Sequence, residues 1–157
     1  MTEFKRILAP TDLSPLGEGG VRSAAELAHR LGAAITLFHV VSEDELEQLA
    51  NAHMPRHPVD LIYQDLESAV LDQFRRVVPA ELRRDLRTEA MVTVGQSVVE
   101  ILRTAQFKNA DMIVMATHGR TGLARMVMGS VAEQVVRKAP CPVLTVRPAE
   151  VMASAGA

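Results

Sequence analysis

The feature of the sequence that most restricts its fold is a regular alternation between short aliphatic blocks and segments with helical periodicity. The aliphatic blocks cover residues 7–9, 34–41, 90–94, 112–116 and 142–146. Most of them are continuous apolar runs, which are typical of parallel strands that are buried on both faces. The segments between them place apolar residues three and four positions apart, as amphipathic helices do. The order βαβαβαβαβ predicts five parallel strands joined by four right-handed crossover helices.

The four predicted helices have apolar stripes over residues 21–31, 62–77, 98–105 and 132–139. Ser14 and Pro15 favour the start of the first helix, Gly32 favours its end, and Pro79 closes the second. Residues 97–100 and 130–133 both read Ser-x-x-Glu, the capping box, so we expect a serine to cap each of the last two helices. Residues 42–58 lack this periodicity and are predicted to form a long connection.

The composition agrees with an α/β fold, and we expect a doubly wound, Rossmann-like parallel sheet in the order 3-2-1-4-5 with helices on both faces. Hydrophobic residues make up 48% of the chain, but aromatic residues make up 3% and Trp is absent, so the core must be aliphatic. A length of 157 residues suits one domain. We expect this domain over residues 1–148 and a flexible C-terminal tail over residues 149–157.

Several classes of protein are excluded by counts alone. Seventeen basic and nineteen acidic residues leave a formal charge of −2, which argues against a nucleic-acid binder that relies on positive potential. One cysteine excludes a disulfide framework and a cysteine-rich zinc site. Pro55 breaks the helix that would bring His53 and His57 together, so we expect no metal site. Apolar runs of about 20 residues are missing, which predicts a cytoplasmic protein without a membrane span.

In a doubly wound sheet, ligands bind at the carboxyl ends of the strands, where the strand order reverses. This rule points to the loops after the first and fourth strands. In the fourth loop, Gly119 and Gly122 let backbone N–H groups approach a phosphate, and Arg120 adds positive charge. Gly129 and Ser130 begin the next helix, whose N-terminus attracts anions. The loop and helix predict a phosphate cradle, although the Walker and Gly-x-Gly-x-x-Gly patterns are both absent.

Each of these residues also has a structural interpretation. Ser130 fits a helix cap, Gly119 and Gly122 fit turns, and Asp12 fits a cap or a turn. We favour a nucleotide or phosphate ligand because all of these features fall on the two loops that meet at the switch point.

Other polar residues are assigned structural places. His118 has no nucleophile and carboxylate arranged around it and is interpreted as a loop residue, whereas His39 is interpreted as a packed side chain. Cys141 enters a strand and is interpreted as a small hydrophobic residue. The arginine pairs at 75–76 and 83–84 alternate with acidic residues and indicate a solvated helix face.

Three segments carry a resemblance to a known family: residues 7–12 (Ile-Leu-Ala-Pro-Thr-Asp), residues 39–41 (His-Val-Val) and residues 116–147. With them the chain resembles the universal stress proteins from about residue 4 to residue 148. The ATP-binding branch of that family carries Gly-x2-Gly-x9-Gly-Ser/Thr. Here Gly119, Gly129 and Ser130 match the motif, and Ala116 replaces its first glycine.

The resemblance implies that ATP, alone or with Mg²⁺, binds at the switch point. The residues implied to flank the adenosine are Pro10, Thr11 and Asp12, with the Asp12 carboxylate near the ribose hydroxyls. Val40 is implied to contact the adenine, with Met115 and Ala116 beneath it. The residues implied to hold the phosphates are Gly119, Arg120, Gly129, Ser130 and Val131.

The resemblance also implies a homodimer formed through the last strand, Val143 to Arg147, and a regulatory role in the stress response. Nucleotide occupancy would then set the order of the loop over residues 117–129 and the surface shown to a protein partner, which the sequence does not identify. We expect at most slow ATP hydrolysis, because no residue can be named that would activate water.

Two alternatives remain open at this stage. Ala116 favours a nucleotide-independent interaction module with a vestigial cleft. A nucleotidyl-transferring enzyme of a related fold is less favoured, because Ser-Gly-Gly-x-Asp-Ser and His-x-Gly-His are both missing near the first strand.

Overall fold

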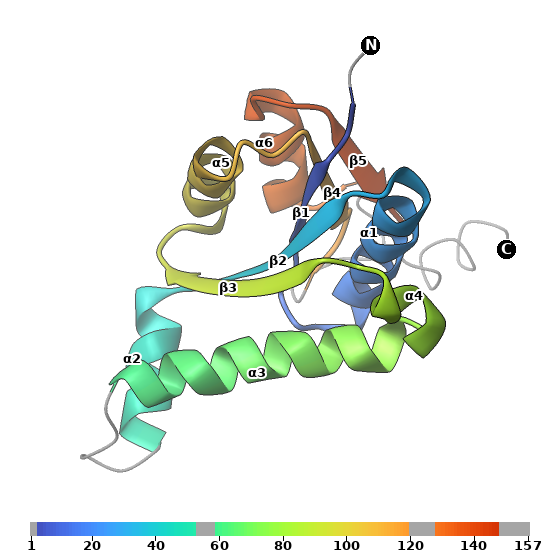
Figure 1. The fold of residues 1–157 in the computed structure, drawn as a ribbon. Helices are drawn as coiled ribbons and strands as arrows, with labels where there is room; N and C mark the ends of the chain where they lie inside the picture. The colour runs from blue at the N-terminus through green and yellow to red at the C-terminus, as the bar shows by residue number, and fades with distance from the viewer. Residues whose placement is uncertain (1–2, 53–58, 120–127, 148–157) are drawn as a thin grey trace, which may run out of the picture.

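A five-stranded parallel sheet forms the centre of the molecule (Figure 1). The computed structural model describes residues 3–52, 59–119 and 128–147. The strands are β1 (Arg6–Pro10), β2 (Ala34–Val41), β3 (Thr88–Val94), β4 (Met112–Ala116) and β5 (Val143–Val146). Their order is β3-β2-β1-β4-β5, and every neighbouring pair is parallel. The predicted fold class and strand order are therefore confirmed, while the expected tail lies outside the described residues.

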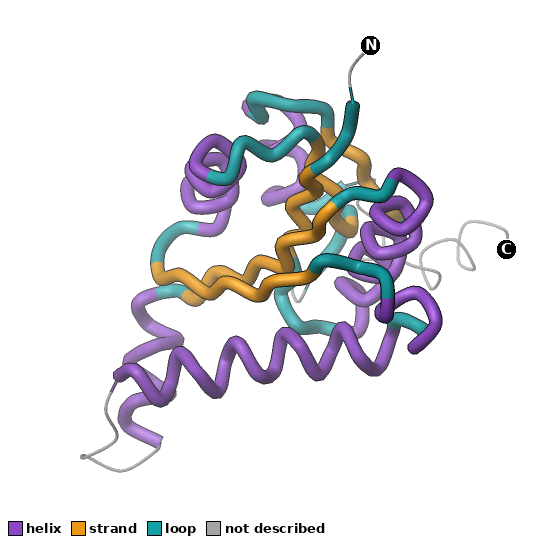
Figure 2. Tube along the Cα trace, viewed as in Figure 1, coloured by secondary structure: helices purple, strands orange, loops and turns teal. Residues whose placement is uncertain are grey.

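Helices cover both faces of the sheet, so that strands lie between helical layers (Figure 2). They are η1 (Pro15–Gly17), α1 (Glu18–Leu31), α2 (Glu43–Ala52), α3 (Val59–Val77), α4 (Ala80–Arg84), α5 (Ser97–Phe107) and α6 (Ser130–Lys138). α1 and α3 pack on one face, and α5 and α6 on the other. Across the described parts of the chain, no helix combines the length and apolar character that a membrane span needs.

The alternation of side chains along β1 divides the core into two clusters. Ile7 belongs to the cluster under α1 and α3, whereas Leu8 belongs to the cluster under α5 and α6. Each fully buried aliphatic side chain of this size contributes about 1.5–3 kcal/mol. The outer strands β3 and β5 are only partly buried. The expectation of burial on both faces was therefore wrong for them, because an edge strand is covered less completely than a central one.

α1 lies unusually close to the carboxyl end of β4, and a glycine permits this approach. A Cβ atom on Gly20 would lie 2.6 Å from the backbone nitrogen of Ala116. The neighbouring Gly19 has no such constraint, since its Cβ would meet only a Val146 methyl group at 3.8 Å. Helix α1 therefore rests on the backbone of β4 through Gly20.

The connection predicted over residues 42–58 contains a helix, α2, so that prediction was wrong for this segment. The helix buries none of its residues, which explains why its sequence lacks the apolar periodicity that would have predicted it. Its start is fixed locally, because the hydroxyl of Ser42 accepts a hydrogen bond from Glu45 N at 3.1 Å. Three acidic residues in its first turn favour the positive end of the helix dipole. The short helix α4 was also not predicted.

Candidate functional site

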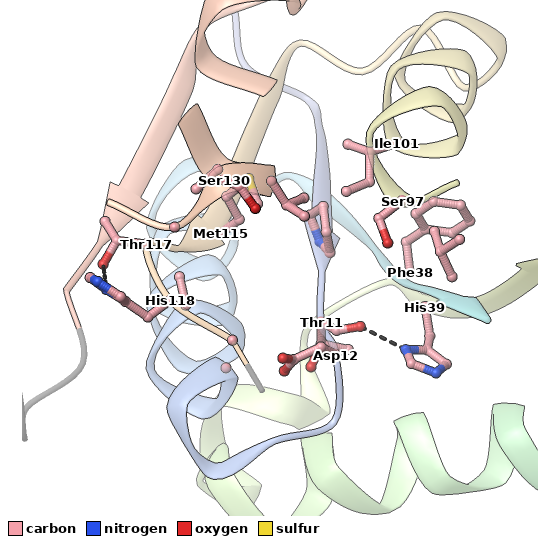
Figure 3. A pocket seen from close by; sticks show the side chains of 18 of the residues that line it. Thr11, Asp12, Phe38, His39, Ser97, Ile101, Met115, Thr117, His118 and Ser130 are labelled. Atoms are coloured by element: carbon pink, nitrogen blue, oxygen red, sulfur yellow. Dashed lines mark hydrogen bonds between the residues drawn. The ribbon is translucent and has the colours of Figure 1, made fainter. Parts of the chain in front are cut away.

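The loops after β1 and β4 meet around a pocket of about 310 Å³ at the carboxyl ends of the strands (Figure 3). Ten of the twelve predicted site residues line it: Pro10, Thr11, Asp12, Val40, Met115, Ala116, Gly119, Gly129, Ser130 and Val131. The other two, Arg120 and Gly122, lie outside the described residues. The fold thus gathers the predicted residues in one place, while the contact of each with a ligand stays a prediction.

Thr11 directly follows β1, and all of its polar groups form hydrogen bonds that hold the first loop in place. Its backbone nitrogen donates to Phe38 O (2.8 Å), and its hydroxyl donates to Gln73 Oε1 (2.7 Å) and accepts from Leu13 N (3.1 Å). The carbonyl of Thr11 accepts from Nδ1 of His39 (2.8 Å), a buried side chain as expected. These bonds hold Leu13 at a positive φ of 64°, which non-glycine residues rarely adopt.

Gln73 was missed by the sequence interpretation, although α3 carries it into the core beside this loop. Its side chain is 2% exposed, and its amide nitrogen donates to Ser14 O at 3.4 Å. The available signal was a polar residue on the apolar side of a helix, next to Phe74. A buried polar side chain of this kind needs partners, and here the partners are the two ends of the β1 loop.

Asp12 lies where the two loops cross. Its Oδ1 accepts from the backbone nitrogen (3.0 Å) and the hydroxyl (2.6 Å) of Ser14. The Ser14 hydroxyl accepts in turn from Gly17 N at 3.2 Å, so Ser14 caps η1, while α1 begins only at Glu18. On the opposite loop, a Cβ on Gly119 would collide with the Asp12 carboxylate. The lack of a side chain at Gly119 therefore lets the second loop pass close to Asp12.

The β4 loop is joined to α6 by a tight backbone contact. Gly129 N donates to Thr117 O at 2.6 Å, and a Cβ on Gly129 would lie 2.8 Å from that oxygen. Thr117 and His118 are each 3% exposed, and the Thr117 hydroxyl lies 2.9 Å from His118 Nδ1. His118 is therefore a buried member of the loop.

Helix α6 points its N-terminus at the pocket. Gly129 occupies the N-cap with an extended backbone, so Ser130 is the first helical residue and the predicted serine cap was wrong. The first helical hydrogen bond runs from Glu133 N to Gly129 O (3.0 Å). The N–H groups of the three preceding residues consequently have no acceptor within the helix. All three residues line the pocket: Ser130, Val131 and Ala132.

A second helix, α5, also begins at the pocket, which the sequence interpretation missed. Gln96 is its N-cap and makes no side-chain capping bond, so the predicted cap at Ser97 was wrong as well. Ser97 is instead the first helical residue and lines the pocket, where Figure 3 shows its side chain. In both helices, Ser-x-x-Glu fits a capping box by spacing, but the backbone conformation of the preceding residue decides which residue caps.

Apolar side chains form one wall of the pocket between these two helix ends. Val40 and Met115 were predicted there, and Phe38 and Ile101 join them. Phe38 is 1% exposed and was taken from the sequence as a strand residue only. The pocket therefore combines a flat apolar wall with a polar end.

The charge in the pocket comes from two carboxylates, Asp12 and Glu45, the latter at the start of α2. Among the lining residues that the structure describes, Lys and Arg are absent. An anion would be attracted instead by the N-termini of α5 and α6, each equivalent to about half a positive charge. The described residues contain no group of three or more side chains suited to a metal ion. Chemically, the site suits a molecule with an apolar ring and an anionic group.

Known proteins resemble this chain along most of its length. The universal stress protein MJ0531 of Methanocaldococcus jannaschii is 31% identical over 144 residues, which cover 92% of this chain and 82% of that protein. YxiE of Bacillus subtilis, another universal stress protein, is 27% identical over 92% of this chain and 99% of its own length.

Solved structures agree in fold. MJ0577 of M. jannaschii matches with a TM-score of 0.70 and 26% identity, over 92% of this chain and 96% of the other. A universal stress protein in complex with cAMP matches with a TM-score of 0.60 and 19% identity, over 93% and 98% of the two chains. The profile of the Universal stress protein family matches residues 3–147. The chain therefore belongs to the universal stress protein family.

Proposed function

We propose that the pocket binds an adenine nucleotide, ATP alone or as its magnesium complex, and that the protein is a regulatory member of the stress response. The observation that carries this proposal is the first turn of α6, where three N–H groups without helical acceptors line the pocket. The apolar wall of Phe38, Val40 and Met115 suits a purine ring. The complex of a relative with cAMP supports an adenine base.

In this proposal, different residues of the pocket contact the phosphates and the ribose of the nucleotide. The phosphates would contact Gly119, Gly129, Ser130 and Val131, with Arg120 as an additional cation, and the ribose would lie near Pro10, Thr11 and Asp12. The carboxylates of Asp12 and Glu45 would repel a bare triphosphate, so we expect ATP to bind more tightly as its magnesium complex, whose net negative charge is smaller. We expect turnover well below about 1 s⁻¹, since no residue can be named that would activate water.

The main alternative, a nucleotide-independent interaction module, rests on Ala116. Successive side chains of a strand point to opposite faces, which puts the Ala116 methyl group on the face of Val114 and α1 rather than that of Met115. The extra methyl group then costs the ligand little space. Restoring the motif with Ala116→Gly should change the affinity for ATP by less than about threefold, equivalent to about 0.7 kcal/mol, whereas a vestigial cleft should gain binding.

Calorimetric titration with ATP, with and without Mg²⁺, tests the proposal. Gly129→Val places a side chain against Thr117 O, and Gly119→Val places one against Asp12. Each should lower the affinity by at least about 100-fold, or 2.7 kcal/mol. Gly19→Ala, which meets no close contact, is the matched control and should bind like the wild type. Absence of binding by the wild type, or binding that neither valine substitution changes, would refute the assignment.

The proposed dimer forms through the segment from Val143 to Arg147, which contains β5 and the residue after it. Within the described sheet β5 pairs with β4 alone, and its Leu144 is 43% exposed. Sedimentation analysis tests this edge, with Leu144→Glu expected to give monomers. Leu31 on α1 is also 43% exposed, so Leu31→Glu is the matched control and should stay dimeric. A dimer that survives Leu144→Glu would place the interface elsewhere.

A further inference from the structure

A second concave surface lies where α1, the end of α3 and α4 meet. This groove has a volume of about 410 Å³ and shares no lining residue with the nucleotide pocket. Its charged lining residues are Arg22, Glu26, Arg75, Arg76 and Arg83. The sequence indicated only a solvated helix face for three of these arginines. The fold adds Arg22 from a distant helix and turns that face into a basic groove.

Two of the arginines are anchored to the backbone side by side. Nε of Arg22 donates to Val77 O at 3.1 Å, and Nε of Arg83 donates to Val78 O at 3.0 Å. The two acceptors are the consecutive carbonyls of Val77 and Val78 at the end of α3, and both arginines line the groove there. A guanidinium group has five N–H donors in a rigid plane. The Nε bond fixes that plane and leaves the four Nη hydrogens for another partner.

The remaining arginines of the groove have carboxylate partners. Arg76 pairs with Glu18 at 2.6 Å, and Arg75 pairs with Asp72 at 2.9 Å. Arg22 and Arg83, by contrast, form no ion pair with any carboxylate of the described residues. Against these two cations, Glu26 is the only carboxylate among the described lining residues. Within the described part of the chain, the groove therefore keeps an excess of positive charge.

We propose that this groove binds a phosphate dianion through Arg22 and Arg83. Capping the last carbonyls of α3 needs one donor from each residue, which a lysine would also supply. Two fixed guanidinium forks match the oxygen spacing of phosphate, to which arginine binds bidentately. The phosphate belongs either to a small metabolite or to a phosphorylated side chain of a partner. The site is independent of the nucleotide pocket.

Titration with inorganic pyrophosphate, followed by NMR of the Arg Nε–H groups and of the backbone amides near Val77, tests the proposal. The experiment is run with ATP present, so that the nucleotide pocket is filled. We expect saturable shifts confined to the groove, and at least tenfold weaker binding by the double variant R22Q/R83Q. R75Q/R76Q removes the same charge from the paired arginines and should weaken binding less than threefold.

Three controls keep the result interpretable. R22K/R83K keeps the charge and a donor for each α3 carbonyl but loses the fork, so a folded variant with weakened binding supports the site. Binding of a phosphate monoester such as phosphoserine should strengthen as the pH rises through about 6, because phosphate monoesters become dianionic there. Equal shifts with chloride at matched ionic strength, or unchanged binding by R22Q/R83Q, would reveal an adventitious ion only and overturn the proposal.

A phosphoserine peptide and its unphosphorylated form distinguish the two sources. Binding of the phosphopeptide at least tenfold tighter than inorganic phosphate indicates a partner protein, and comparable binding indicates a small metabolite. Binding of neither phosphate nor phosphopeptide overturns the proposal, whatever the nucleotide pocket does.

Discussion

The amino and carboxyl ends of the β1–β4 pair differ in the backbone groups that join the two strands. The strands are registered over only two residue pairs, Ile7 with Met112 and Leu8 with Ile113. At the amino end Asp111 joins them, because its nitrogen donates to Arg6 O (2.9 Å) and its Oδ2 accepts from Lys5 N and Arg6 N (both 2.9 Å).

At the carboxyl end the same strands separate. Thr11 N bonds to Phe38 O on β2, and Thr117 N bonds to Val146 O on β5, both at 2.8 Å. Beyond their shared pairs, β1 therefore continues to bond to β2 and β4 continues to bond to β5, rather than to each other. The pocket opens between the two strand ends. The position of the site thus depends on the hydrogen bonds of Thr11 N and Thr117 N, which hold the ends of β1 and β4 apart.

Two titratable groups near the amino end, Asp111 and Cys141, have shifted pKa values. Burial raises the pKa of Asp111, but hydrogen bonds from Lys5 N, the Arg6 guanidinium and Arg6 N lower it by more, so it lies below its ordinary 3.8. Burial, followed by the charge of Asp111, raises the pKa of the Cys141 thiol above 9.0. Cys141 therefore stays neutral and packs as the small hydrophobic residue that the sequence indicated.

The open end should be the most sensitive to added volume. Gly20→Ala puts a Cβ 2.6 Å from Ala116 N, a backbone atom that cannot rotate away, and should lower the free energy of unfolding by about 3 kcal/mol. Gly19→Ala should raise it by up to about 0.5–1 kcal/mol, since alanine favours the helix. Urea denaturation measures both. Equal stabilities of the two variants would show that α1 does not support the end of β4.

Gln73→Leu should destabilise the loop after β1, at the carboxyl end of the sheet. The Thr11 hydroxyl would lose its acceptor inside the core, at a cost of about 2 kcal/mol, and ATP binding should weaken. Gln134 on α6 is exposed, so Gln134→Leu is the control and should change stability by less than about 0.5 kcal/mol. Adding Thr11→Val to Gln73→Leu should recover part of the loss. A double variant with the summed cost would contradict this pairing.

Asp111→Asn removes charged hydrogen bonds at the amino end of the β1–β4 pair and should lower the free energy of unfolding by about 1 kcal/mol at pH 7. A carboxyl group whose pKa is lower in the folded state than in the unfolded state stabilises the fold fully at a pH above the unfolded-state pKa. This stabilisation is lost as the pH falls through the folded-state pKa. The stability difference between wild type and variant should therefore shrink below pH 3.8. Glu133→Gln, which breaks an exposed pair with Arg137, is the control and should show a smaller dependence on pH. Thermal unfolding across this range measures both.

Ser130→Ala should have the smallest effect on stability, below about 0.5 kcal/mol, because the hydroxyl does not cap α6. It should nevertheless weaken ATP binding about three- to tenfold, or 0.7–1.4 kcal/mol. Ser14→Ala, which removes a real cap, should cost about 1 kcal/mol. If Ser130→Ala destabilises the fold as much as Ser14→Ala, the serine is a cap after all.

The parallel sheet and the position of the cleft were predictable, because aliphatic periodicity indicates alternating strands and helices and ligands of doubly wound sheets bind at the switch point. Residues of the cleft that follow directly after β1 and β4, such as Thr11 and Gly119, were predictable for the same reason. Gln73 was not, since its contact with Thr11 spans 62 residues and leaves no local pattern. The positions of Ser97 and Ser130 were misjudged because spacing alone does not fix the backbone angles of the preceding residue. Helix α2 was missed because it buries nothing.

The separation of the β1–β4 partners along the chain has a consequence for biogenesis. Arg6 and Asp111 are 105 residues apart, whereas β1 meets β2 much sooner. The cluster under α1 and α3 draws almost entirely on residues before 93, so this half can collapse while later residues are still being synthesised. The pocket forms only after β4 and α6 have docked. Docking of these elements closes the longest loops, whose entropy cost therefore falls on the last step of folding. A ligand in that pocket therefore recognises only the finished fold, and its binding energy is added to the step that completes the protein.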